Sequence, residues 1–110
     1  MVVNSLKNNL DKVDEKIILL TIIGSVEAIK NGGITIDEAE KFIFSPHMEN
    51  RLKSKGCNED IIELIMKGCE LEDIVSLIPH CLNDVLSEIK QEALFLIKEY
   101  KTFDESFWIE

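Results

Sequence analysis

Positive charge is scarce in this chain. Lysine and arginine together number 12 against 21 aspartates and glutamates, which gives a formal net charge of −9, and Arg51 is the only arginine. Nucleic acids and anionic membranes are bound by concentrated cationic surfaces, because such binding releases counterions. The composition therefore argues against a nucleic-acid partner and against a membrane partner. A single arginine among many lysines, isoleucines and asparagines is typical of an AT-rich, bacterial genome.

Histidine and cysteine are also few, and their spacing matches no common metal site. His80 and Asp84 lie four residues apart, which places both on one face of a helix, but no HExxH motif and no third ligand at a recognisable spacing accompanies them. Cys57, Cys69 and Cys81 are spaced twelve residues apart and form no CxxC pair. We predict buried, reduced thiols, no cofactor and no catalytic residue, so that the protein is not an enzyme. The alternative is a metal-dependent hydrolase that uses His80 and Asp84.

Long apolar runs are missing as well. The most apolar stretch, residues 16–30, is too short to span a membrane and has charged neighbours. The first ten residues lack the charged head and the apolar run of a secretory signal peptide. A chain of 110 residues has the size of one domain. We therefore expect a single helical domain over residues 1–110, located in the cytoplasm.

Helical periodicity runs through the chain, and no segment alternates apolar and polar residues for long enough to predict a strand. We predict an all-α fold, a compact bundle of five or six helices with a long first and a long last helix. Residues 17–23 are apolar in nearly unbroken succession, so a helix there is apolar on every side and must be central or pressed against a second chain. Residues 80–100 give the clearest amphipathic pattern. Ala93 is expected to meet Gly24 where the two long helices cross.

The start of the first helix has two interpretations. Apolar residues recur at steps of three and four from residue 6 onward, which predicts a helix from about Ser5 to Asn31. Alternatively, the helix breaks at residues 8–9 and restarts after a cap at Asp11, and the N-terminal residues fold back over the core. The longer helix would extend about 40 Å, beyond the reach of short neighbours. It would expose apolar side chains that a homodimer can cover, with an interface formed by Leu6, Leu10, Val13 and Ile17.

Cap residues divide the middle of the chain into short helices. Thr35 and Glu38 match a capping box, in which the threonine hydroxyl accepts from the backbone three residues on. Ser45 followed by Pro46 matches the start of a further helix.

A repeated pattern follows these caps. Gly56 and Gly68 each precede a cysteine, acidic residues and an apolar stretch, so residues 55–65 and 67–78 look alike. We predict a glycine stop in each, and the likeness is either a duplication or a chance similarity between two capped helices. The end of the chain is rich in aromatics, and we expect four apolar residues there to dock on the bundle: Phe103, Phe107, Trp108 and Ile109.

Asp84, Glu88 and Glu92 form an acidic stripe on the last helix, with no cation four residues on in the favourable order. We interpret the stripe as a candidate face for a basic partner, with a solvated surface as the alternative. The function predicted is protein binding, as an inhibitor or immunity-type protein or as a regulatory partner. The alternative is a purely structural subunit whose partner is itself.

Two segments resemble a known group of proteins. The stretch GCELEDIVSLIP at residues 68–79, with ITIDEAEKFIF at residues 34–44, is similar to segments of small acidic helical proteins of Gram-positive bacteria whose function is unknown. The resemblance implies an all-helical fold and a bacterial source. It implies no catalytic residue.

Overall fold

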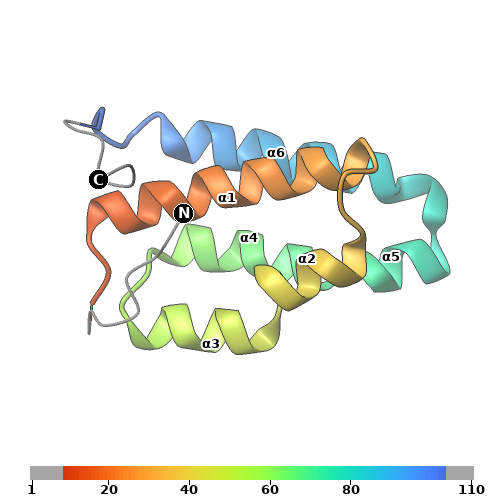
Figure 1. Cartoon of the computed structure of the whole chain (residues 1–110), viewed down its shortest axis with the longest axis horizontal. Helices are drawn as coiled ribbons and strands as arrows, with labels where there is room; N and C mark the ends of the chain where they lie inside the picture. The colour runs from red at the N-terminus through yellow and green to blue at the C-terminus, as the bar shows by residue number, and fades with distance from the viewer. Residues whose placement is uncertain (1–8, 104–110) are drawn as a thin grey trace.

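The computed structural model describes residues 9–103 of the chain, which fold into a bundle of helices (Figure 1). The elements in order are α1 (Lys12–Lys30), α2 (Ile36–Phe42), α3 (Pro46–Ser54), α4 (Glu59–Cys69), α5 (Leu71–Leu77), the 3-10 turn η1 (Pro79–Cys81) and α6 (Leu82–Ile97). No strand occurs between residues 9 and 103, so the predicted all-α class is confirmed.

Four of the helices are long enough to form the bundle. There are 19 residues in α1, 9 in α3, 11 in α4 and 16 in α6, whereas α2 and α5 have 7 each. The prediction of five or six bundle helices is therefore wrong in number, because α2 and α5 are too short to line the bundle. The long first and last helices are present as predicted, and they run antiparallel beside each other (Figure 1).

The core lies where α1 meets α4 and α6. Its side chains are the inward faces of these three helices, and each is at most 2% exposed: Ile18, Leu19, Ile22, Val26, Ile61, Leu64, Ile65, Leu86, Ile89 and Ala93. Full burial of one leucine or isoleucine stabilises a fold by about 1.5–3 kcal/mol relative to exposure. The packed core therefore fixes the positions of the side chains on the outer faces of α1, α4 and α6.

One face of α1 is open, so the helix is not covered on every side within the chain, and the alternative of a second chain against this face stays a prediction. Val13 is 42% exposed and Leu20 is 46% exposed, both on the side away from the core. Gly24 lies on this exposed side, and a Cβ there would meet nothing within 4 Å. The predicted crossing of Gly24 with Ala93 is therefore wrong, since Ala93 points into the core while Gly24 points away from it.

A capping box starts α1. The Asp14 backbone N–H donates to the Asp11 carboxylate over 2.8 Å, and the Asp11 N–H donates back to Asp14 over 3.3 Å. The restart after a cap at Asp11 is therefore confirmed, and a helix continuous from Ser5 is wrong because residues 9–11 are not helical. The predicted fold-back of the N-terminal residues lies outside the described residues. The caps at Thr35 and Ser45 are also confirmed, since their hydroxyls accept from the backbone N–H groups three residues on, each over 3.0 Å.

The two glycines of the repeated pattern differ in structure. Gly56 has a φ of +77°, which glycine adopts without steric penalty, and it follows the end of α3 as predicted. Gly68 lies inside α4, buried, with the Phe44 ring packed directly on its Cα. The prediction of a glycine stop there is wrong, because Gly68 makes room for a side chain. Cys57 is buried, whereas Cys69 and Cys81 are only half-buried.

Candidate functional site: a groove between α4 and α6

Two adjacent hollows lie between α4 and α6, with volumes of about 630 and 390 Å³. Both are lined by Asp60 of α4 and Leu96 of α6, so they meet at these two residues. The larger hollow extends to the N-terminal part of α1 and to Phe103. We call the two hollows together the α4–α6 groove.

The groove has an apolar floor and differently charged ends. The apolar side chains that line it are Val13, Ile61, Phe95, Leu96 and Phe103. The basic end, in the larger hollow, carries Lys12, Lys16 and Lys101, and Glu99 and the shared Asp60 line this hollow as well. The acidic end, around the smaller hollow, carries Asp60, Glu63 and Glu92.

Helical spacing produces this lining. Residues three or four apart in a helix lie on the same face. Asp60 and Glu63 therefore share one face of α4, and Glu92, Phe95 and Leu96 share one face of α6. Phe95 is 68% exposed, because it lies on the side of α6 away from the core.

A buried carboxylate holds the basic end together. Glu15 of α1 is 4% exposed, and its Oε1 accepts from the Tyr100 hydroxyl over 3.0 Å and from Lys12 Nζ over 3.3 Å. Its Oε2 accepts from the backbone N–H of Asn58, the N-cap of α4, over 2.8 Å. A buried charge is tolerated only where such partners surround it. We call these four residues the Glu15 network, and it joins α1, the start of α4 and the chain after α6.

The network sets the ionisation of its neighbours. Burial, together with the hydrogen bond to Glu15, raises the pKa of the Tyr100 phenol. Burial and the nearby charge of Glu15 raise the pKa of the Cys57 thiol to about 12. Both groups therefore stay protonated near neutral pH, and the Cys57 thiolate needed for nucleophilic chemistry is not formed there.

Aromatic rings position two of the lysines at the basic end. The Lys12 ammonium lies 5.6 Å from the centre of the Tyr100 ring, and the Lys16 ammonium lies 4.2 Å from the centre of the Phe103 ring. Lys16 also donates to the backbone carbonyl of Lys101 over 2.8 Å. Cations at such distances over a ring are attracted by its negative face. These contacts hold positive charge at the rim of the groove.

The predicted partner face overlaps the acidic end only at Glu92. Lys67 of α4 donates to Glu92 over 2.6 Å and to Glu88 over 3.1 Å, while Asp84 is exposed near the start of α6. These hydrogen bonds raise the pKa of Lys67. The stripe is thus partly neutralised by a cation from another helix. Binding of a basic partner by this stripe stays a prediction.

The three predicted dimer residues that the structure describes do not share one exposed surface. Leu6 lies outside the described residues. Leu10 is half-buried, Val13 lines the groove, and Ile17 is 5% exposed and already covered within the chain. The long helix from Ser5 that motivated the interface is absent, and the homodimer itself stays a prediction. Of the four C-terminal residues expected to dock on the bundle, Phe103 lines the groove. The other three, Phe107, Trp108 and Ile109, lie outside the described residues.

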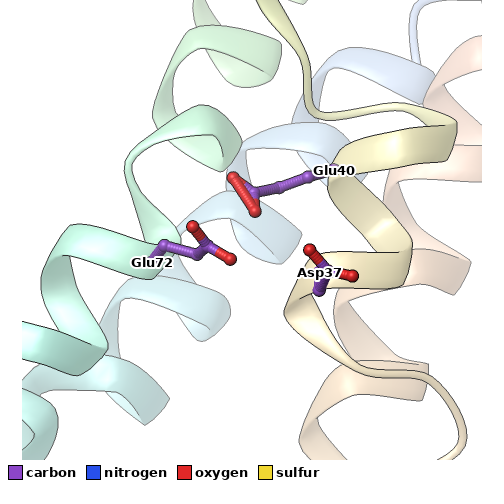
Figure 2. Close-up of side chains that lie close together, drawn as sticks. All are labelled: Asp37, Glu40 and Glu72. Carbon is purple, nitrogen blue, oxygen red and sulfur yellow. The ribbon is translucent and has the colours of Figure 1, made fainter.

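His80 and Asp84 are both exposed, on η1 and α6 respectively. The structure brings a different set of possible ligands together: Asp37 and Glu40 of α2 and Glu72 of α5, with one carboxylate oxygen of each within 4.8 Å of the others. Figure 2 shows the three side chains converging from the two helices. Carboxylate oxygens are the usual ligands of Ca²⁺ and Mg²⁺.

Crowding within this acidic set changes its protonation. Burial raises the pKa of Glu40 to about 7, helped by a hydrogen bond to Glu72 and by the charges of Glu72, Asp37 and Asp73. Sequence reasoning missed the set because Glu72 comes from another helix. The spacing of Asp37 and Glu40, three residues apart on one helix, was the one available signal.

Within residues 9–103, no helix is both long enough and apolar enough to cross a membrane. A family model described as "Protein of unknown function (DUF3969)" matches residues 7–110. This chain belongs to the DUF3969 family. No curated protein and no solved structure matches the chain. The expected relation to proteins of unknown function is confirmed, while the Gram-positive source stays a prediction.

Proposed function

We propose that this DUF3969 protein is a protein-binding module, which holds a segment of another protein in the α4–α6 groove. The observation that carries the proposal is the exposed Phe95 ring beside an open hollow with an apolar floor and charged rims. Aromatic side chains are frequent anchors at protein interfaces. Helical grooves with apolar floors are a recurring way to hold a peptide segment.

The groups that line the groove favour binding over chemistry. Tyr100 and Lys12 are engaged with the buried Glu15, and Lys16 is engaged with the Lys101 carbonyl. The elevated pKa of Tyr100 keeps it a hydrogen-bond donor to Glu15 near neutral pH. These three side chains therefore have a structural role in the groove. The rest of its accessible surface is apolar or charged.

The groove is also built on a rigid base. Its walls are helices whose inner faces share one core, and the Glu15 network fixes the junction of three chain segments. A preformed site loses less conformational freedom when a partner binds, and that strengthens binding. We further propose a bacterial, cytoplasmic setting and a partner other than a second copy of this chain.

A matched pair of variants tests the proposal. Phe95→Ala removes the exposed ring in the groove, and Phe42→Ala removes a ring of similar exposure, 51%, on α2. The tagged wild-type protein and both variants are used to capture partners from the cytosol of the source cells. We expect one protein to be captured by the wild type and by Phe42→Ala, and to be lost with Phe95→Ala.

Two results would contradict the proposal. Equal capture by all three proteins would show that the partner binds elsewhere. Recovery of the bait alone, as a dimer in sedimentation equilibrium that Phe95→Ala dissociates, would make the groove a contact between copies of this chain.

A further inference from the structure

The last residue that the structure describes, Phe103, already lies in the α4–α6 groove. It lines the larger hollow, and the Lys16 ammonium lies 4.2 Å from the centre of its ring. Lys16 also donates to the Lys101 carbonyl over 2.8 Å, so α1 holds the backbone just before Phe103. Residues 104–110 of the sequence therefore follow directly from a residue inside the proposed binding site. We call them the 104–110 segment.

The 104–110 segment is rich in large apolar side chains. Phe107, Trp108 and Ile109 follow one another in it. Burial of such side chains against apolar surface is favourable. The groove offers surface of this kind in Phe95, which is 68% exposed, and in Leu96, which lines both hollows.

Reach decides between the groove and other exposed apolar side chains. The five residues from 104 to 108 can span at most about 18 Å, which is more than the diameter of one helix, about 10–12 Å. The segment is therefore long enough to extend from Phe103 along the face of α6. Leu77 and Ile78 are also exposed, but they lie at the α5 end of the bundle, opposite the end where α6 finishes (Figure 1).

We infer that the 104–110 segment occupies the α4–α6 groove when no partner is bound, with Trp108 against Phe95, so that a partner must displace it. The regulatory part of this inference rests on the function proposed above. A segment joined to its site by a few residues competes at an effective concentration on the order of millimolar. It can therefore fill the groove through weak contacts, and it lowers the apparent affinity for a partner in proportion to the time that the groove is free.

Fluorescence of Trp108, the only tryptophan, reports the position of the segment in the full chain. We expect emission at a shorter wavelength, and weaker quenching by acrylamide, than in the urea-unfolded chain, because the indole is covered. Phe95→Ala should move both values toward those of the unfolded chain while the helical circular dichroism is retained. Phe42→Ala, which removes an exposed ring on α2, is the control and should leave both unchanged.

The effect on binding is measured with the protein that the wild type captures in the assay above. Phe107→Ser combined with Ile109→Ser weakens the contacts of the segment and keeps Trp108 as the reporter. If the segment fills the groove nine-tenths of the time, this variant should bind the captured protein about tenfold more tightly than the wild type does. Ser106→Ala, a polar position in the same segment, is the control and should bind like the wild type.

Contrary results overturn separate statements. Trp108 emission equal to that of the unfolded chain would overturn the docking, and so would a shift caused by Leu20→Ala, on the open face of α1, but not by Phe95→Ala. Emission that changes on dilution would place the segment in the groove of a second copy. Equal affinity of the Phe107→Ser and Ile109→Ser variant and the wild type would overturn the competition. These results leave the proposed function standing. Trp108 docked as expected, with no captured protein that needs Phe95, would overturn the proposed function and leave the groove as a site for the chain's own segment.

Discussion

Tyr100 donates its hydroxyl hydrogen to the buried carboxylate of Glu15 over 3.0 Å, across 85 positions of sequence. The bond fastens the chain just after α6 to the first turn of α1. Glu15 also accepts from the backbone N–H of Asn58, so the same carboxylate fixes the start of α4. The basic end of the α4–α6 groove is built on this junction.

Loss of the Tyr100 hydroxyl should destabilise the fold. Tyr100→Phe keeps the ring over Lys12 but leaves one lone pair of Glu15 without its donor, and such a loss costs about 1–3 kcal/mol. The free energy of unfolding in urea measures the effect. Thr102→Val, an exposed polar-to-apolar change two residues on, is the control and should stay within about 0.5 kcal/mol of the wild type. A Tyr100→Phe value as small as that of the control would contradict this role.

The Glu15 network should also behave as a unit. Glu15→Gln keeps the shape of the side chain but turns an amide N–H₂ toward donors, so it should destabilise the fold more than Tyr100→Phe does. In the double variant the two effects should fall short of additivity by about 0.5–3 kcal/mol, because both remove the same bond. The full double-mutant cycle in urea measures this coupling. Strict additivity would show that the two residues act independently.

Two glycines in helices should respond in opposite directions to alanine. Gly68→Ala places a methyl group against the Phe44 ring in the core, and overpacking of this kind costs about 1–3 kcal/mol. Gly24→Ala adds the same methyl group where nothing lies within 4 Å, and the better helix propensity should stabilise the fold by about 0.5–1 kcal/mol. Thermal unfolding of both variants decides the matter, and a stabilised Gly68→Ala would refute the packing described here.

The acidic set on α2 and α5 should make stability depend on pH. The pKa of Glu40 in the folded protein is about 7, above its ordinary 4.5, so the folded state holds this proton more tightly than the unfolded chain. The stabilisation from this group is therefore full below about pH 4.5 and is lost as the pH rises through about 7.

Glu40→Gln should remove that dependence. The variant should gain stability relative to the wild type between about pH 5 and about pH 8, because it has no charge to place beside Glu72 and Asp37. Urea unfolding at both pH values gives the difference. Glu38→Gln, an exposed change on the same helix, is the control, and its difference from the wild type should not vary over this range. If the stability difference between Glu40→Gln and the wild type were also the same at both pH values, the folded protein would not hold the Glu40 proton more tightly than the unfolded chain does.

Features that depend on neighbouring residues were predictable from the sequence. The hydroxyls of Thr35 and Ser45 and the carboxylate of Asp11 act on backbone groups three residues away, so their spacing carries the information. The amphipathic pattern of α6 is local in the same sense. Its core residues lie on the face that the periodicity indicated.

Features made by tertiary packing were not predictable in this way. Glu15 looks in the sequence like an ordinary acidic residue in the first turn of a helix. Only the hydrogen bonds that it accepts from Tyr100 and from the Asn58 backbone make it a buried junction. Gly68 resembles a helix stop until Phe44 is packed on it. The cation for Glu92 comes from Lys67, 25 residues earlier and on another helix, which no spacing rule within α6 could reveal.

The groove was missed for the same reason. Its ends come from α1, α4 and the chain around α6, and Lys101 is far in sequence from Lys12 and Lys16 at the same end. Phe95 was the single local signal, since it is a large aromatic side chain on the polar side of an amphipathic helix.

The central claim is that a partner segment lies in the α4–α6 groove, and backbone amide chemical shifts test it most directly. The partner captured by the wild type is titrated into the ¹⁵N-labelled protein, with ¹⁵N-labelled Phe95→Ala as the control. We predict that the largest shift changes fall on groove residues such as Asp60, Leu96 and Lys101, and that they vanish in Phe95→Ala. Changes centred instead on α2 and α5, around Asp37 and Glu72, would contradict the account.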